Sequence, residues 1–466
     1  MTSPYQGYVY SYPHKTAYRP LVPRPSLREV WAEEQDQALF LYLHVPFCEM
    51  RCGFCNLFTR TGAPASLVTA YLDALERQAA VTREALPEAR FAAAAIGGGT
   101  PTYLEAGELA RLLDIAEEVM GADLRAIPFG VETSPATATP DRLAVLTDRG
   151  VTRISIGVQS FVDAEARAAV RPQRRAEVET ALAAIRTAGP PVLNLDLIYG
   201  IDGQTEASWL HSLDAALAWR PEEMYLYPLY VRPLTGLGMR PGAWDDQRLR
   251  LYRTGRDHLL GAGYEQVSMR MFRRRVSSTV PGASPAPAMG SPYDASPASS
   301  GSSPYDVSPG SSYDASPGEE YSCQRDGMVG LGCGARSYTE RLHYSFEYAV
   351  AIRHVRAIID DYVRLPREEF ARANAGFALD AAERRHRHLL QSLLQARGLD
   401  RAAYEERFGA DVLDDFDLDG YAARGWLECD AERVRLTPEG LAHSDAIGPA
   451  LFSTRVRELM DTYDHR

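Results

Sequence analysis

The sequence has few cysteines, almost no lysine and no long apolar run. Its 466 residues contain only six cysteines, which excludes a small scaffold held together by many disulfides. No segment approaches the ~18 consecutive apolar residues of a membrane-spanning helix, so we expect no membrane span. The first residues have neither a basic start nor a continuous apolar stretch. The sequence therefore shows no secretory signal and predicts a cytoplasmic location.

The charged residues are ordinary in number but unusual in kind. Fifty Lys and Arg residues oppose 62 Asp and Glu residues, which gives a net charge of −12, and Lys15 is the only lysine. The arginines do not gather into a basic domain, so nucleic acid is not expected as a partner. Apolar residues make up 45% of the chain and charged residues 24%, as is typical of a globular protein.

Short β-rich runs alternate with longer amphipathic runs from residue 40 to about residue 230, which predicts βα units around a parallel sheet. The expected strands cover residues 40–45, 91–96, 127–132, 152–157, 192–198 and 224–229. The expected helices between them cover residues 66–86, 106–120, 140–149, 175–188 and 205–218. Six strands are too few for a complete eight-stranded barrel. The predicted fold class is therefore α/β, with a partial (βα)6 TIM-like barrel.

Composition divides the chain into five parts. Residues 1–39 form an N-terminal arm, and residues 40–275 form the barrel. Residues 276–320 are rich in Ser and Pro. They predict a disordered insertion, because such a stretch buries too little apolar surface to offset its ordering entropy. Residues 321–375 are expected to connect the barrel to residues 376–466. In this last part, helical patterns at 380–397, 401–407 and 411–424 precede a strand-turn-helix pattern and predict a winged-helix-like α+β domain.

Three cysteines, Cys48, Cys52 and Cys55, fall within eight positions just after the first expected strand. Enzymes built on βα barrels place their chemistry at this end of the strands. Three thiolates on so short a loop can hold three irons of a [4Fe–4S] cluster, and no fourth cysteine follows nearby. The fourth iron is thus left open for a ligand. A structural zinc site would need a fourth protein ligand.

The cysteine spacing, together with Phe54, resembles the signature of radical S-adenosylmethionine (SAM) enzymes. Residues 41–55 (Leu-Tyr-Leu-His-Val-Pro-Phe-Cys-Glu-Met-Arg-Cys-Gly-Phe-Cys) look like the oxygen-independent coproporphyrinogen III oxidase family. Further motifs of that family follow in order at residues 97–104, 131–135, 155–161, 194–200, 330–338 and 436–440. The family also includes haem chaperones and radical methyltransferases. The resemblance implies the radical SAM type of barrel and two cofactors, a [4Fe–4S] cluster and SAM.

The resemblance also implies nine cofactor contacts, most of them in the cysteine loop or at the ends of expected strands. They are Tyr42, Phe54, Gly98, Gly99, Thr100, Glu132, Gln159, Arg171 and Asp196. By this resemblance the 98–100 segment meets the amino group and methionyl part of SAM, and Phe54 lies on its adenine. Tyr42 is placed near both SAM and substrate, as the candidate catalytic residue.

Other interpretations of these residues stay open from the sequence alone. The glycines at 97–99 also suit a tight strand-to-helix turn. Arg171 would ordinarily be a solvated side chain, and Tyr42 would ordinarily be a core aromatic. His44 is expected to be a hydrogen-bonded histidine of the barrel interior.

Residues 10–19 combine aromatic side chains with His14, Lys15 and Arg19 upstream of the barrel. A planar, multiply anionic tetrapyrrole needs aromatic faces and cations, so this segment is a candidate substrate contact, as are the arginines of residues 270–275. An ordinary N-terminal arm and a solvated surface are the alternatives.

The resemblance implies an oxidoreductase that cleaves SAM reductively on the cluster to a 5′-deoxyadenosyl radical. The expected electron donor is flavodoxin or ferredoxin. The reaction would be the oxidative decarboxylation of coproporphyrinogen III. The oxidases carry a further cysteine two positions after the third, where this chain has Leu57. Two alternatives therefore stay open. One is a radical C-methyltransferase or cyclopropanase that uses a second SAM in natural-product or porphyrin metabolism. The other is a haem-binding chaperone without oxidase activity.

Overall fold

The computed structural model describes residues 3–34, 38–171, 173–230, 237, 245–275, 314–315, 319–320, 327–347 and 352–463. The Ser/Pro-rich insertion expected at 276–320 lies outside the described residues, apart from two-residue strands β12 (Asp314–Ala315) and β13 (Glu319–Glu320). Among the described residues, no helix has the length and apolar character needed to cross a bilayer.

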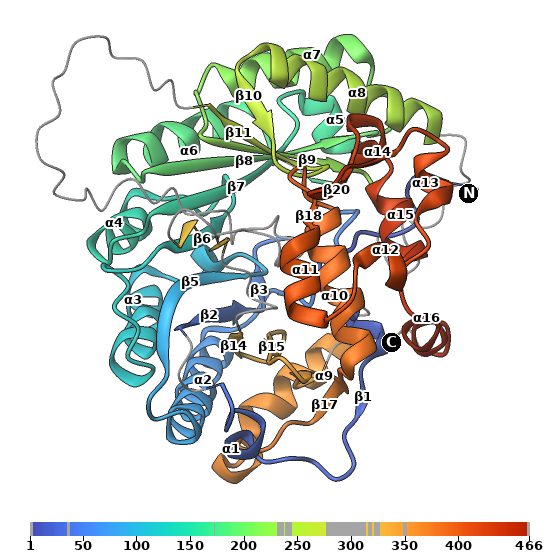
Figure 1. Cartoon of the computed structure of the whole chain (residues 1–466). Helices are drawn as coiled ribbons and strands as arrows, with labels where there is room; N and C mark the ends of the chain where they lie inside the picture. Colours follow the sequence, from blue (N-terminus) through green and yellow to red (C-terminus); the bar gives the residue numbers. More distant parts are fainter. Residues whose placement is uncertain are drawn as a thin grey trace, which may run out of the picture.

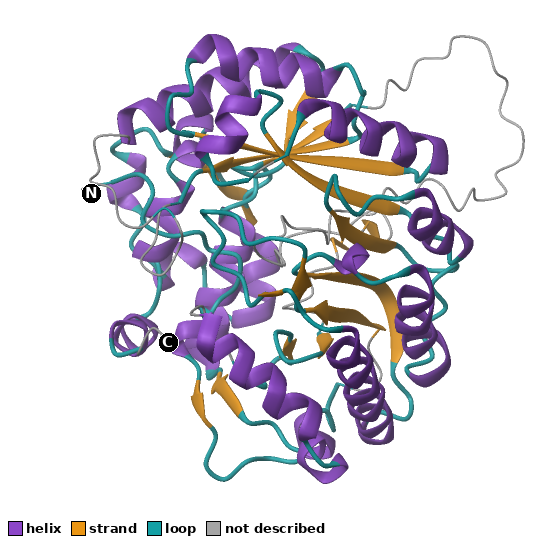
Figure 2. Ribbon diagram, turned by 180° about the vertical axis from the view of Figure 1, so that it is seen from behind, coloured by secondary structure: helices purple, strands orange, loops and turns teal. Residues whose placement is uncertain are grey.

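Six parallel strands form the centre of the sheet (Figure 1). In spatial order they are β2 (Ala38–Val45), β5 (Arg90–Gly98), β6 (Phe129–Thr133), β7 (Arg153–Gln159), β8 (Val192–Tyr199) and β9 (Glu223–Pro228). Figure 2 shows the connecting helices outside the strands. They are α2 (Ala65–Ala85), α3 (Ala106–Asp114), α4 (Pro140–Asp148), α5 (Asp163–Ala168), α6 (Arg175–Ala188) and α7 (Glu206–Leu217). The predicted partial (βα)6 barrel is confirmed.

The central strands are buried on both faces, and the two faces differ in chemistry. On β7, Ile154, Ile156 and Val158 belong to the main apolar core under the helices. Arg153 alternates with them and so faces the barrel interior, where its Nε donates to Glu223 Oε2 at 2.8 Å. A buried charged pair is costly unless it is fully bonded. The polar interior therefore marks the barrel axis as the place where polar chemistry is concentrated.

The sheet extends beyond the barrel on both sides and has thirteen strands in total among the described residues. β14 (Met328–Leu331) pairs parallel with β2, and four antiparallel strands continue outward from it. These are β15 (Arg336–Tyr338), β16 (Leu342–Ser345), β17 (Ala375–Ala378) and β1 (Arg19–Pro20). On the other side, β10 (Tyr264–Gln266) and β11 (Met271–Arg274) form a hairpin, and β11 pairs antiparallel with β9. The expected connecting region thus contributes strands to the main sheet.

The C-terminal residues have an apolar core of their own. Its helices include α10 (Ala381–Leu393), α11 (Arg401–Phe408), α14 (Pro438–Ala442), α15 (Ser444–Ala450) and α16 (Thr454–Asp461). Its antiparallel sheet has the order β18 (Leu399–Asp400), β20 (Arg433–Leu436), β19 (Leu427–Cys429). The prediction of one helix over 411–424 is wrong. The chain forms two short helices there, α12 (Val412–Asp415) and α13 (Asp419–Ala422). The segment is rich in Asp, which favours helix caps over helix interiors.

The remaining helices flank the sheet extension and β9. They are α1 (Leu27–Val30), α8 (Asp245–Gly261), α9 (Ile352–Arg364) and four short segments, η1 (Lys15–Ala17), η2 (Pro101–Tyr103), the π-helical η3 (Ile115–Val119) and η4 (Arg367–Ala371). Because η3 follows α3 directly, the helix expected at 106–120 is confirmed with a π-helical last turn.

The N-terminal arm runs between the barrel and the C-terminal domain. Tyr5 packs in the main core, with its ring centroid 6.3 Å from that of Tyr199. Tyr12 is buried in the C-terminal core, where its hydroxyl donates to Glu383. Between them, the amide of Gly7 donates to the carbonyl of Asp445 at 3.1 Å. The arm therefore joins the two apolar cores.

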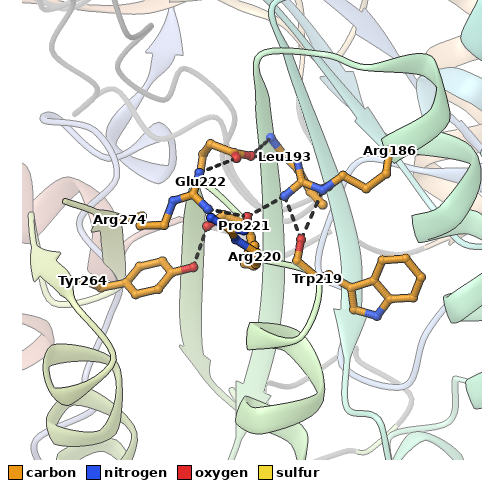
Figure 3. A network of polar contacts seen from close by, with 8 residues as sticks. All are labelled: Arg186, Leu193, Trp219, Arg220, Pro221, Glu222, Tyr264 and Arg274. Carbon is orange, nitrogen blue, oxygen red and sulfur yellow. Dashed lines mark hydrogen bonds and ion pairs between the residues drawn. The ribbon is translucent and has the colours of Figure 1, made fainter. Parts of the chain in front are cut away.

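A polar network closes the end of the barrel opposite the cysteine loop (Figure 3). Glu222 Oε1 accepts from Arg274 at 2.8 Å, and its Oε2 accepts from Arg186 at 3.0 Å and from the amide of Leu193 at 2.9 Å. One carboxylate thus ties the starts of β8 and β9 to α6 and β11. These contacts stabilise the barrel and lie away from the candidate site.

Candidate functional site

The cysteine loop begins on β3 (Phe47–Cys48), directly after β2. Two backbone hydrogen bonds dock its start on the end of β5. The amide of Gly99 donates to Val45 O, and the amide of Thr100 donates to Phe47 O, both at 2.7 Å. The loop is therefore held at the carboxyl end of the parallel strands, as expected from its position in the sequence.

The glycines at the end of β5, Gly97–Gly99, are required by packing against neighbouring segments of the site. Gly98 has φ +120°, and a Cβ there would lie 2.7 Å from the His44 ring. A Cβ on Gly99 would overlap the Phe47 carbonyl. A Cβ on Gly97 would lie 3.0 Å from Glu132 Oε2 and 3.1 Å from Tyr42 Oη. The missing side chains thus let three neighbouring segments of the site approach the backbone of β5.

Tyr42, His44 and Glu132 lie together beside these glycines. Tyr42 Oη is 3.2 Å from His44 Nδ1, and Glu132 Oε2 accepts from the amide of Gly98 at 3.2 Å. All three side chains are at least nine-tenths buried. Burial lowers the pKa of His44 to about 4, so this imidazole is neutral near pH 7. The expectation that His44 is a hydrogen-bonded interior histidine agrees with this environment.

Arg171 lies directly over the cysteine loop. Its Nη1 is 3.2 Å from Cys52 Sγ, its Nη2 donates to Gly157 O at 2.7 Å, and its Nε donates to Gln173 Oε1 at 2.7 Å. The side chain is only 5% exposed, so the interpretation as a solvated residue is wrong. This guanidinium places a positive charge beside the cysteine loop.

Two residues with strained backbone flank this arginine. Gln159, at the end of β7, has φ +68°, and Val170 has φ +52°. Positive φ is uncommon outside glycine and is unfavourable for a β-branched residue. The Val170 segment docks on the loop, because Gly53 donates to Ala169 O at 3.1 Å, and a Cβ on Gly53 would lie 2.7 Å from Val170 Cγ2. The strain therefore occurs where the barrel holds the cysteine loop in place.

Asp196 is fully buried on β8, two residues from Asn194. Asn194 Nδ2 donates to Asp196 Oδ1 at 2.8 Å. Within the described part of the chain, Asp196 Oδ2 and Asn194 Oδ1 have no hydrogen-bond partner. Burial raises the pKa of Asp196 to about 7, against the opposing effects of Asn194, Arg153 and Arg171. Two buried acceptors without donors are expected where a ligand supplies hydroxyl or amino groups.

Phe54 lies in an apolar cluster that joins the cysteine loop to the ends of β8 and β9. The cluster also contains Cys52, Cys55, Leu57, Ile198, Ile201, Tyr225 and Tyr227. The rings of Tyr225 and Tyr227 stack at 5.7 Å with an interplanar angle of 13°. This cluster gives a flat ligand an apolar, aromatic wall beside the sulfur atoms.

The cysteine loop fits an iron–sulfur cluster by the chemistry of its donors. Cys52 and Cys55 are buried, and Thr100 Oγ1 lies 3.1 Å from Cys48 Sγ. Burial raises the pKa of Cys48 and Cys55, so these thiolates need a metal to offset the loss of hydration. No three His, Cys, Asp or Glu side chains form a single-ion site in the parts of the chain that the structure describes. The cysteines of a cubic cluster are spread more widely, because each binds a different iron.

The structure thus gathers the three cysteines and the nine predicted cofactor contacts around one end of the barrel. The candidate substrate contacts at 270–275 do not all lie there, because Arg273 and Arg274 face Glu223 and Glu222 at the start of β9, at the opposite end. The sequence interpretation missed one contributor, Asn194, and also the buried pair of Arg153 with Glu223, which lies in the barrel interior at the starts of β7 and β9. Their only signal is the period-2 pattern that places polar residues on the inner face of β7, β8 and β9.

Comparison with known proteins identifies two family models. The model described as "Radical SAM superfamily" matches residues 42–216, and the "HemN C-terminal domain" model matches residues 379–443. Radical SAM proteins use a [4Fe–4S] cluster and SAM, so the two predicted cofactors are confirmed at the level of the family.

Curated relatives carry two kinds of name. The chain is 34% identical over 194 residues to a haem chaperone, HemW, of Bacillus subtilis, covering 42% of this chain and 51% of the relative. It is 33% identical over 278 residues to the oxygen-independent coproporphyrinogen III oxidase of Paracoccus denitrificans, covering 57% of this chain and 60% of the relative. The chain therefore spans between half and two thirds of the length of these relatives.

A solved structure matches the whole fold. Coproporphyrinogen III oxidase (HemN) from Escherichia coli aligns over 98% of both chains with a TM-score of 0.73 and 21% identity. At this identity the match establishes the fold, which includes the arm, the barrel and the C-terminal domain.

Proposed function

We propose that this radical SAM protein with a HemN C-terminal domain is an enzyme that cleaves SAM reductively and acts on a tetrapyrrole, as a coproporphyrinogen III oxidase-like enzyme. The observation that carries the proposal is the placement of the cysteine loop. It faces polar residues from four strands of the barrel, β2, β6, β7 and β8, namely Tyr42, Glu132, Gln159 and Asp196. The names of the oxidase relatives support the tetrapyrrole as substrate.

Cys48, Cys52 and Cys55 would hold the cluster, which when bound supplies the electron that converts SAM to a 5′-deoxyadenosyl radical. Asp196 and Asn194 offer acceptors for ribose hydroxyls, and Glu132 offers one for an amino group. Arg171 keeps a positive charge beside Cys52. Phe54 provides an apolar face for the adenine.

The segments that cover the barrel mouth would limit the access of water to the proposed site. The arm places Tyr8 against Tyr227, with ring centroids 6.5 Å apart, and the C-terminal domain packs over the arm. Exclusion of water prevents a reactive species from being quenched by solvent. Tyr42, which is 3% exposed, is the candidate residue for orienting the substrate or moving a proton at its Oη.

Haem binding without turnover is the second candidate, because a relative 34% identical is named a haem chaperone. Its candidate haem ligands in this chain are His211 and His343. Leu57, at the position of the oxidases' further cysteine, is buried beside Cys52 and Cys55. His343 is fully buried, with Nε2 3.3 Å from Arg387, and His211 lies on the outer helix α7 beside Arg175. Neither histidine is set at the barrel mouth as an axial ligand.

The test is anaerobic reconstitution followed by incubation with SAM and dithionite. The chain should form 5′-deoxyadenosine, and Cys52→Ala should abolish this product. Cys429→Ala is the matched control, because Cys429 is exposed on the C-terminal domain and its loss should change nothing. Undiminished 5′-deoxyadenosine from Cys52→Ala would contradict the cluster assignment.

The substrate is tested with coproporphyrinogen III and an electron donor such as flavodoxin. A vinyl product supports the oxidase. A methylated product accompanied by S-adenosylhomocysteine points instead to a methyltransferase. Stable haem binding with neither product supports the chaperone.

A further inference from the structure

The inner face of the barrel carries a layer of polar side chains beneath the candidate site. Asn194 of β8 is at the centre of this layer. The strand register places Ser155 of β7 opposite Asn194 on one side and Glu223 of β9 opposite it on the other. Asp196 follows two residues later on the same face of β8, one layer nearer the cysteine loop. The layer of Asn194 therefore lies directly under the carboxylate that is proposed to contact SAM.

Arg153 joins the two sides of this layer. Its Nε donates to Glu223 Oε2 at 2.8 Å, and its Nη1 donates to the Ser155 hydroxyl. One guanidinium therefore reaches from β7 to β9 and passes Asn194, which lies on the strand between them. The side chains of Arg153 and Glu223 are 1% and 2% exposed, so the pair is shielded from solvent.

One donor and one acceptor of this layer are left without a protein partner. Within the part of the chain that the structure describes, Arg153 Nη2 has no acceptor and Asn194 Oδ1 has no donor. Buried polar groups are rarely left unpaired, and a guanidinium presents its donors in a fixed planar fork. A single bridging water would satisfy both atoms.

The orientation of the Asn194 amide decides how Asp196 is held. Asn194 Nδ2 donates to Asp196 Oδ1 at 2.8 Å. If the amide were flipped, its oxygen would face the carboxylate, and two acceptors would repel each other. The positive charge of Arg153 on the other side of Asn194 favours the orientation with the amide oxygen toward Arg153 and the NH2 group toward Asp196. Asp196 Oδ1 is then occupied, and Oδ2 is left for a ligand hydroxyl.

We propose that Arg153, held by Glu223, is a positioning residue that orients Asp196 toward the ribose of SAM through Asn194. Arg153 Nη2 donates to Asn194 Oδ1 through one water, and the amide of Asn194 fixes the carboxylate of Asp196. An amide oxygen accepts two hydrogen bonds, so Asn194 can still accept a ribose hydroxyl. That the ligand is SAM rests on the proposed function, whereas the connection from Arg153 to Asp196 does not.

The test compares SAM with its 2′,3′-dideoxy analogue by equilibrium dialysis, using the anaerobically reconstituted chain without reductant. The natural chain should bind SAM about tenfold more tightly than the analogue, which lacks the hydroxyls that Asp196 accepts. The double variant Arg153→Met with Glu223→Met removes both charges and keeps apolar volume, so it should fold. It should lose about fivefold of the preference for SAM, with unchanged binding of the analogue. An equal loss for both ligands, or an undiminished preference, would overturn the proposal.

Asn194→Ala tests the connection itself. If Arg153 acts through Asn194, this variant alone should reduce the preference for SAM at least as much as the double variant. Combining it with the double variant should then cause no further loss, and additive losses would contradict the proposal. The matched control is Arg149→Met with Glu117→Met, an ion pair on the outer helical layer whose side chains are 23% and 19% exposed. Its preference for SAM should be unchanged.

A crystal structure of the cofactor-free natural chain gives a measurement that needs no variant. It should show one water within hydrogen-bond distance of both Arg153 Nη2 and Asn194 Oδ1. A dry gap between these atoms would overturn the proposed connection even where the natural chain cleaves SAM. If the water is present but the natural chain binds no SAM, the connection from Arg153 to Asp196 stands, and the assignment of its ligand fails together with the proposed function.

Discussion

One buried ion pair joins the barrel to the C-terminal domain. Arg270 Nη2 lies 2.6 Å from both carboxylate oxygens of Asp445 and donates to Tyr230 Oη at 2.9 Å. The side chains of the pair are 4% and 1% exposed. The guanidinium also lies 3.7 Å from the centroid of the Tyr8 ring. The Arg270 guanidinium of the barrel therefore contacts both the arm, at Tyr8, and the C-terminal domain, at Asp445.

Asp445→Ala should lower the free energy of unfolding by about 3–5 kcal/mol, because it leaves the Arg270 guanidinium buried without its counter-charge. The double variant Arg270→Leu with Asp445→Leu removes both charges and keeps apolar volume. It should recover at least about 2 kcal/mol of that loss, since buried pairs replaced by apolar residues are often neutral in stability.

The assay is urea unfolding of the full chain without cofactors, followed by circular dichroism and by tryptophan fluorescence. Asp361→Ala serves as the control. Asp361 is 72% exposed, 3.9 Å from Arg364, so its loss should change stability by no more than about 0.5 kcal/mol. The reasoning is refuted if Asp445→Ala costs less than about 1 kcal/mol, or if the double variant is as unstable as the worse single variant.

Three further outcomes are expected. Burial raises the pKa of Asp196 to about 7, so the folded chain keeps a proton there that the unfolded chain releases near pH 4. This carboxyl makes the free energy of unfolding fall as pH rises from about 4 to about 7. Asp196→Asn should therefore raise the free energy of unfolding of the cofactor-free chain, measured in urea at pH 8. The same variant should weaken SAM binding, measured by equilibrium dialysis, about tenfold. An unchanged free energy of unfolding at pH 8 would contradict the raised pKa of Asp196. Gly99→Ala should abolish incorporation of the cluster, measured by absorbance, because the added Cβ would overlap the Phe47 carbonyl. Gly107→Ala is the control, because a Cβ there meets nothing within 4 Å. This control should incorporate a normal cluster and be up to about 1 kcal/mol more stable. Glu222→Ala should lower the melting temperature but leave 5′-deoxyadenosine formation per folded molecule unchanged, and a loss of that activity would place its network in the chemistry.

The sequence predicted the six central strands closely, and the reason lies in their burial. β8 (Val192–Tyr199) was expected at 192–198, because a run of apolar and β-branched residues bounded by Pro and Gly has few alternatives to a buried strand. The outer strands β14–β17 were not predicted. They have only three or four residues each, and β14 pairs with β2, nearly 290 residues earlier. Short segments with distant partners carry little local signal.

The sequence by itself determined the cofactor chemistry, because three cysteines within eight positions must come close wherever the loop lies. It also determined the order of βα units, since the alternation of strand and helix patterns is local. Only the tertiary structure decided what surrounds the loop. It brings Arg171 to Cys52 across 119 residues and Arg270 to Asp445 across 175 residues. Such contacts depend on packing between distant segments, which no local pattern of residues specifies.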